Sequence, residues 1–262
     1  MSRLGLRFAA LGYLAVLLLV PLGMVFWRTF EHGFWPALHA VTTPEALHAL
    51  WLTILIVLIV VPANTVFGVV CALAIVRRRF RGKGIVNALV DLPLALSPVV
   101  VGLALFLLYG RLGWFGNWLA AHGIKVIFAL PGMVLATMFI SLPFVVREVV
   151  PVLREIGTEQ EQAAATLGAN RMQRFLRVTL PAIRWGVAYG VVLTTARALG
   201  EFGAVSVVSG HLVGKTETLT LYVQDQYQDF NVAGAYAASV VLALLAVATL
   251  LVMTMFRRKA EV

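Results

Sequence analysis

The sequence predicts an all-α integral membrane protein with six transmembrane helices. Of its 262 residues, 61% are hydrophobic and only 13% are charged, whereas soluble domains carry about a quarter charged residues. Apolar windows of about 20 residues, the length that crosses a bilayer, recur along the chain. These windows cover residues 8–27, 49–76, 85–109, 129–146, 185–209 and 232–256.

The first window follows a basic N-terminus, with Arg3 and Arg7 before the apolar run. This pattern resembles a secretory signal peptide, but no small-x-small cleavage site follows it, which favours a retained signal anchor. We therefore expect residues 1–44 to form an N-terminal transmembrane helix and an outer loop.

The distribution of Lys and Arg predicts the orientation. If the N-terminus is cytoplasmic, the outer loops hold only Arg111, Lys125 and Lys215, and most other basic residues fall in inner segments. Cytoplasmic loops of membrane proteins carry this excess of positive charge. The bias predicts that both termini are cytoplasmic, and it explains the net charge of +9 without a nucleic-acid partner.

The third window contains two prolines, Pro93 and Pro98, on either side of Ser97. Proline interrupts helical hydrogen bonding, which a membrane tolerates where protein or a cavity satisfies the freed groups. Ser97 and Pro98 are therefore candidate residues of a translocation path, and Ser206 is a weaker candidate.

The fifth window carries two charges, Arg197 and Glu201, four residues apart. On a helix they share a face and are expected to pair. Either charge left unpaired in hydrocarbon would cost several kcal/mol. Two interpretations stay open: a structural ion pair that closes the bundle, or an Arg197 that biases a translocation path toward anions.

A polar segment, residues 147–184, separates the fourth and fifth windows. Thr158 and Glu161 predict a capping box, Gly168 a left-handed turn without room for a large side chain, and Asn170 the cap of a second helix. A helix-turn-helix of this kind also occurs in DNA-binding proteins, but two flanking membrane spans argue against that use. The segment predicts a helix pair on the cytoplasmic face, where a soluble partner docks.

The sequence offers no catalytic or metal site. Gly210 to Thr216 is similar to a P-loop, but three residues instead of four separate its glycines and it follows a membrane span. Cys71 is the single cysteine, and the five histidines follow no ligand spacing. We therefore expect no enzyme activity, no metal and no cofactor in this chain, so any ATP and Mg²⁺ would be bound by a partner.

The polar segment resembles the EAA loop of bacterial ATP-binding-cassette (ABC) importer permeases. Gln162-Ala163-Ala164, Gly168 and Val178-x-Leu180-Pro181 keep the spacing of that loop, with Gln162 in place of the usual Glu and Val178 in place of Ile. The resemblance implies a type I permease domain at residues 45–256, a cytoplasmic tail at 257–262 and an ATPase-docking surface. That surface would comprise Glu161, Gln162, Ala163, Ala164, Gly168, Ala169, Leu180 and Pro181.

Residues 91–103 and 196–223 resemble permeases for tetrahedral oxyanions, and the chain is more similar to the W-type subunit of sulfate/thiosulfate importers than to molybdate permeases. The resemblance implies a multi-pass protein of the inner membrane that works with an ABC ATPase dimer, a T-type permease subunit and a periplasmic sulfate-binding protein. A molybdate or tungstate permease is one alternative. An ion-coupled secondary transporter is another, and it would need intramembrane acids, for which only Asp91 and Glu201 are candidates.

Overall fold

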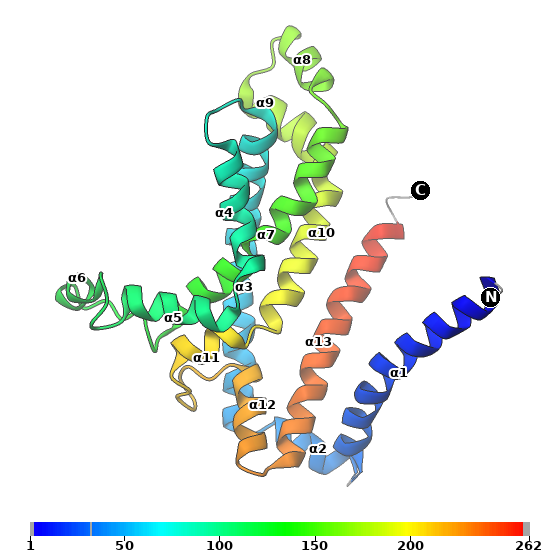
Figure 1. Cartoon of the computed structure of the whole chain (residues 1–262), viewed down its shortest axis with the longest axis vertical. Helices are drawn as coiled ribbons and strands as arrows, with labels where there is room; N and C mark the ends of the chain where they lie inside the picture. The colour runs from blue at the N-terminus through cyan, green and yellow to red at the C-terminus, as the bar shows by residue number, and fades with distance from the viewer. Residues whose placement is uncertain (1–2, 32, 259–262) are drawn as a thin grey trace.

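The computed structural model describes residues 3–31 and 33–258, and within them the protein is helical with no strand. The predicted all-α class is confirmed. The elements, drawn in Figure 1, are α1 (Arg3–Phe30), α2 (Phe34–Val41), α3 (Pro44–Arg77), α4 (Lys83–Ala95), α5 (Pro98–Tyr109), α6 (Gly116–Ala121), α7 (Leu130–Glu155), α8 (Glu159–Thr166), α9 (Arg171–Arg174), the π-helix η1 (Phe175–Thr179), α10 (Leu180–Leu199), α11 (Gly203–Ser209), α12 (Leu219–Gln228) and α13 (Val232–Arg258).

Five stretches of helix in the described part of the chain are long and apolar enough to cross a membrane, and the number is six if the bent pair of α4 and α5 counts as one span. The third window, 85–109, is therefore not one continuous helix: its two halves meet at an angle of 111°. Leu96 and Ser97 adopt extended conformations before Pro98 begins α5. The ring of a proline disfavours helical geometry in the preceding residue, so the bend falls where the sequence places Pro98.

The fifth window is also interrupted. Helix extends from Arg171 to Leu199, and a break at residues 200–202 separates it from α11. The prediction of one span over 185–209 is wrong in both its limits, since the helix begins inside the polar segment and stops before Glu201. Likewise α7 extends through the predicted loop start at Arg147 to Glu155, which leaves residues 156–170 as the connection and its short helix.

The centre of the bundle is formed by α3, α7 and α10. Glycines permit the close approach of these helices: a Cβ on Gly68 would lie 2.6 Å from Val145 Cβ, and one on Gly190 would lie 2.7 Å from Val145 Cα. Val69, Val149 and Ile183 pack beside this contact and are buried. The helices are therefore held by direct backbone-to-side-chain packing, as is typical of membrane helix pairs.

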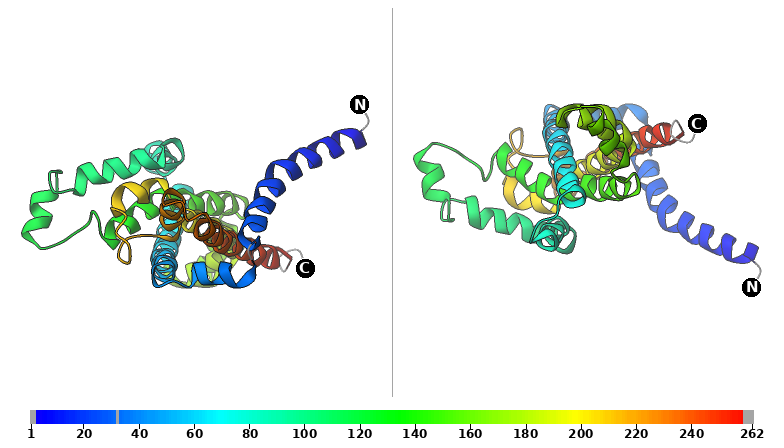
Figure 2. Two further views of the ribbon diagram at one scale, coloured as in Figure 1. Left: turned by 90° about the horizontal axis from the view of Figure 1, so that it is seen from below. Right: turned by 90° about the horizontal axis from the view of Figure 1, so that it is seen from above.

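Two parts of the chain leave this bundle, as Figure 2 shows. One is α1, in which none of residues 11–28 is buried. The other is the α5–α6 arm, residues 98–129, which projects sideways from the end of α4 (Figures 1 and 2). Of the predicted tail 257–262, residues 259–262 lie outside the described residues.

Candidate functional site

The polar segment forms one end of the structure, where α8 and α9 lie beyond the end of α13 (Figure 1). We call it the inner end, because the distribution of Lys and Arg predicts that it is cytoplasmic. Gly168 has a φ of +84°, and Asn170 and Gln173 form a complete capping box at the start of α9. Both predictions from these residues are confirmed. The expected crowding at Gly168 is wrong, because nothing lies within 4 Å of a Cβ built there.

The predicted capping box between Thr158 and Glu161 is absent. The Thr158 side chain makes no cap hydrogen bond and instead accepts one from Gln162 Nε2 at 3.0 Å. Glu161 Oε1 accepts from Arg77 Nε at 3.2 Å, from Arg77 Nη2 at 3.1 Å and from Thr179 Oγ1 at 3.0 Å. A charged guanidinium is a stronger donor than a backbone amide at an exposed helix start, so Glu161 joins α8 to α3 and η1 instead.

The remaining residues of the predicted docking surface are gathered around α8. Gln162 and Ala163 are exposed on α8, and Ala164 accepts the backbone hydrogen bond of Ala169 at 3.0 Å. Leu180 and Pro181 form the first turn of α10, and Pro181 is exposed. The structure therefore brings the two halves of the EAA-like pattern to one end of the bundle.

Uncovered apolar side chains accompany this surface. Leu167 is 88% exposed and Met172 65% exposed, and α8 has no buried residue. Apolar side chains in water at the end of a membrane bundle are typical of a protein-binding surface.

The two helix breaks meet in the middle of the molecule. A Cβ on Gly203 would lie 2.8 Å from Pro98 Cβ, and one on Gly102 would lie 2.8 Å from Ala204 O. The first turns of α5 and α11 are therefore in direct contact. Ser97 is exposed just before α5, and Ser206 donates to Gly203 O at 2.9 Å.

The Arg197–Glu201 pair lies at the second break. Arg197 Nη1 is 2.6 Å from Glu201 Oε2, so the predicted ion pair is confirmed. Glu201 follows the end of α10 instead of lying within the helix, and it is 3% exposed. Its Oε1 accepts from Ala204 N at 2.8 Å, and its carbonyl accepts from Thr220 Oγ1 at 2.9 Å. One carboxylate thus neutralises the arginine and satisfies an amide at the start of α11.

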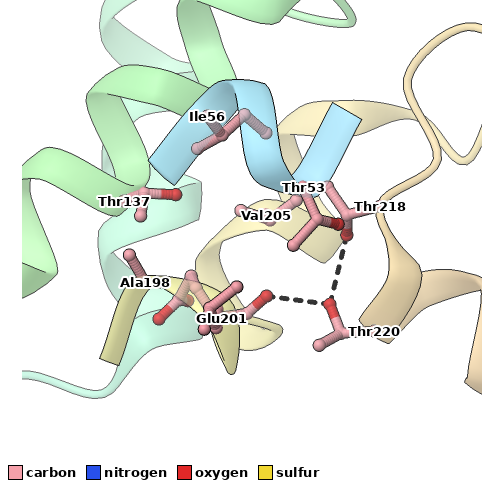
Figure 3. Close-up of a pocket in the computed structure, with 9 residues that line it drawn as sticks. Thr53, Ile56, Thr137, Ala198, Glu201, Val205, Thr218 and Thr220 are labelled. Carbon is pink, nitrogen blue, oxygen red and sulfur yellow. Dashed lines mark hydrogen bonds between the residues drawn. The ribbon is translucent and has the colours of Figure 1, made fainter. Parts of the chain in front are cut away.

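A small polar cavity of about 10 Å³ lies against this break, the volume that admits about one water molecule. Figure 3 shows the side chains that surround it, which come from several helices. Its polar lining includes four residues that the sequence analysis missed: Thr53, Thr137, Thr218 and Thr220. Thr53 Oγ1 accepts from Leu219 N at 2.8 Å while donating to Ala49 O. Single threonines in apolar runs give no sequence signal for such a role.

Beyond the cavity, Glu217 is a fifth residue of this region that no sequence pattern indicated. It is 2% exposed. Burial, with the negative charges of Asp225, Glu45 and Asp229, raises the pKa of Glu217 to about 7. His211 Nδ1 lies 3.2 Å from Asp225 Oδ1. The segment that is similar to a P-loop therefore leads into an acidic cluster, which agrees with its rejection as a nucleotide site.

A helical bundle with buried breaks at its centre and an exposed helical loop at one end defines a membrane transport subunit. Residues 64–262 match the family described as "Binding-protein-dependent transport system inner membrane component". The chain belongs to this family, and its predicted membership of the ABC permeases is confirmed.

Relatives support the same assignment. The sulfate transport system permease protein CysW of Synechocystis sp. is 52% identical over 92% of this chain and 87% of its own length. CysT of Escherichia coli, another sulfate transport system permease protein, is 40% identical over 88% of this chain and 84% of its own. A crystal structure of a bacterial alginate ABC transporter matches with a TM-score of 0.82 at 17% identity, covering 98% of this chain and 93% of that one; it shows the fold alone.

Proposed function

We propose that the chain is the permease subunit of an ATP-driven importer for sulfate or thiosulfate in the cytoplasmic membrane. The observation that carries this proposal is the 52% identity to a CysW sulfate permease across 92% of the chain. Identity to a CysT sulfate permease is lower, at 40%, which favours the W-type position in the complex. Specificity would rest largely on a periplasmic sulfate-binding protein that delivers the anion.

The inner end supports docking of an ABC ATPase dimer. Its exposed Leu167 and Met172 lack a cover in the described chain, and Gln162 and Pro181 face solvent beside them. The ATPase would bind ATP and Mg²⁺, and its closure would move α8. Because Glu161 links α8 to Arg77 on α3 and to Thr179 on η1, that movement would reach the bundle directly.

The α5–α6 arm supports a second permease subunit as partner. If Lys83 lies at the inner membrane surface, the 13 residues of α4 advance about 20 Å, whereas the hydrocarbon core is about 30 Å thick. The chain therefore bends sideways within the membrane. The non-helical backbone on either side of α6 cannot face lipid there, because its polar groups need partners. Leu112 and Trp114 on the arm are 102% and 88% exposed, and a T-type permease would cover them.

The helix breaks support a translocation path near Ser97, Pro98, Arg197, Glu201 and Ser206. Glu201 neutralises the charge of Arg197 and accepts the hydrogen bond of the Ala204 amide. The pair therefore stabilises the break between α10 and α11, and we call this role the lock. The Arg197 side chain keeps 30% of its surface exposed. A passing anion would therefore compete with Glu201 for the guanidinium of Arg197. The pair would then be structural and would also favour anions in the path.

Uptake of radiolabelled sulfate, with molybdate as competitor, tests the proposal in a strain that lacks its own sulfate importers. Expression of this chain with an ATPase, a T-type permease and a sulfate-binding protein should restore uptake that depends on ATP. Molybdate uptake in place of sulfate would assign the chain to molybdate or tungstate transport. Sulfate uptake that persists without the ATPase would contradict the proposal and favour an ion-coupled transporter.

A further inference from the structure

A cleft of about 550 Å³ opens at the inner end between the last turns of α3, the helix α8 and the π-helix η1. Four arginines line it, with a single carboxylate: Arg77, Arg78, Arg171, Arg174 and Glu161. Arg77 is fully engaged, since it donates to Glu161 and to Leu153 O at 3.0 Å. The cleft therefore retains three positive charges without a counter-charge from its own lining.

The three remaining guanidinium groups, on Arg78, Arg171 and Arg174, make no hydrogen bond or ion pair within residues 3–31 and 33–258. The Nε atom of Arg174 is buried and has no hydrogen-bond partner. A buried donor without a partner is costly, and in native proteins it usually indicates a bound water, ion or ligand. Three arginines without a partner in the described chain, one of which carries this buried donor, indicate an anion.

The backbone supports the same conclusion. Arg174 precedes η1, and Phe175 and Thr179 at the two ends of that π-helix also line the cleft. Single π-helical turns are rare in proteins, and a large share of those that occur lie at functional sites. Here the turn places Arg174 and Thr179 against the end of α3, and Thr179 Oγ1 holds Glu161 so that the carboxylate remains paired.

We propose that this arginine cleft binds a tetrahedral oxyanion, sulfate or phosphate, on the inner side of the permease. Planar guanidinium groups match such anions with paired N–H donors. The volume exceeds that of one oxyanion, so the ligand would bind with its water shell or as a phospholipid headgroup. Sulfate as the natural ligand rests on the proposed function, because a sulfate importer would release its cargo on this side; binding of phosphate does not rest on it.

Titration of the full chain in phosphatidylcholine nanodiscs with inorganic sulfate, and separately with phosphate, tests the proposal. Arg174→Gln should raise the dissociation constant about tenfold, and the triple change Arg78→Gln, Arg171→Gln, Arg174→Gln should abolish measurable binding. Helix content by circular dichroism should be equal in all variants, because Gln keeps helix propensity close to that of Arg.

The matched control removes the same charge from the adjacent loop and the start of α4, with Arg79→Gln, Arg81→Gln and Lys83→Gln, none of which lines the cleft. At physiological salt these changes should alter the dissociation constant by no more than about twofold. Equal loss in the control and cleft variants, or equal binding by wild type and the cleft triple variant, would overturn the proposal.

A second pair of titrations distinguishes the sources of the oxyanion. Adding phosphatidylglycerol to the nanodiscs should weaken sulfate binding in wild type if a headgroup occupies the cleft. Unchanged binding would assign the cleft to free anions. Failure of sulfate uptake together with intact phosphate binding would reject the proposed function and leave the cleft in place.

Discussion

The inner end and the helix breaks hold polar groups in opposite ways. At the inner end, α8 has no buried residue, and it is fastened by the side chain of Glu161 to Arg77 and Thr179. At the breaks, Glu201 is buried and the helices touch through Gly102 and Gly203. A helix that binds a partner can stay exposed and be attached to the bundle by a few side-chain hydrogen bonds. A break inside a membrane must satisfy every freed group within the protein.

The largest expected effect comes from removing the charge at the break. Glu201→Ala would leave Arg197 without its counter-charge and Ala204 N without its acceptor. We expect a loss of about 3–5 kcal/mol of unfolding free energy, measured by denaturant titration in detergent. Arg28→Ala is the matched control, because its pair with Glu31 is 49% and 39% exposed and should contribute at most about 1 kcal/mol.

The double change Arg197→Ala with Glu201→Ala sharpens this result. If the pair is structural, removing both charges should cost less than the sum of the single losses, since neither charge then remains alone. Additive losses would show that the two residues act independently and would contradict the lock proposed for the break.

The next effect concerns Glu217, which lies beside Thr218 of the buried cavity. Its pKa rises from 4.5 to about 7 in the folded protein. Below pH 4.5 both states are protonated and there is no cost. Between pH 4.5 and 7 the unfolded chain releases the proton while the folded chain keeps it, so stability falls as pH rises. Glu217→Gln should therefore raise the melting temperature at pH 8 and leave it nearly unchanged at pH 4.

The charges around Glu217 allow a control. Asp229→Asn removes a weaker contributor to the same pKa and should give a smaller rise at pH 8. A Glu217→Gln protein with the same pH dependence of melting as wild type would show that folding does not raise the pKa of Glu217.

Gly102 tests the contact between α5 and α11. A Cβ there would lie 2.8 Å from Ala204 O and 2.8 Å from Val207 Cβ. Because one of these atoms is backbone, Gly102→Ala should force the helices apart and cost about 1–3 kcal/mol. Gly12→Ala is the control, since nothing lies within 4 Å of its Cβ. A stable Gly102→Ala protein with unchanged uptake would show that the contact is loose.

The sequence predicted the inner end better than the breaks, for a physical reason. The conformations of Gly168 and Asn170 follow from neighbours within three residues, and both predictions were confirmed. Thr158 and Glu161 have the same local pattern, but Arg77, 84 residues away, takes the carboxylate. A local motif is reliable only where no distant charge competes for its side chain.

At the breaks, the sequence identified the two charged residues but not the side chains that surround them. The spacing of Arg197 and Glu201 correctly predicted a pair, although the helix stops before Glu201. Thr53, Thr137 and the neighbouring pair Thr218 and Thr220 converge from three places in the chain, and nothing in the sequence links these three places. Pro98 indicated an interruption, but the 111° bend depends on packing against α11.

Substitutions on the proposed docking surface should lower stability less than those at the helix breaks, but they should reduce transport more. Gly168→Trp should stop uptake while the protein remains in the membrane, because the side chain would project from the surface where the ATPase is proposed to dock. The turn has open space, so the stability cost comes from its φ of +84° and should be about 1–2 kcal/mol. Gly168→Asn, which tolerates this conformation, should keep most uptake. Normal uptake in Gly168→Trp would contradict docking at this turn.

The smallest effect separates two caps at the inner end that look alike in sequence. Asn170 Oδ1 accepts from Gln173 N at 2.9 Å, whereas Thr158 makes no cap hydrogen bond. Asn170→Ala should therefore destabilise α9 by about 1 kcal/mol, and Thr158→Ala should change little, since its bond to Gln162 is exposed. Hydrogen exchange of the α8 and α9 amides measures both. Exchange of the α8 amides in the Thr158 variant that is faster than exchange of the α9 amides in the Asn170 variant would contradict the difference between the two caps.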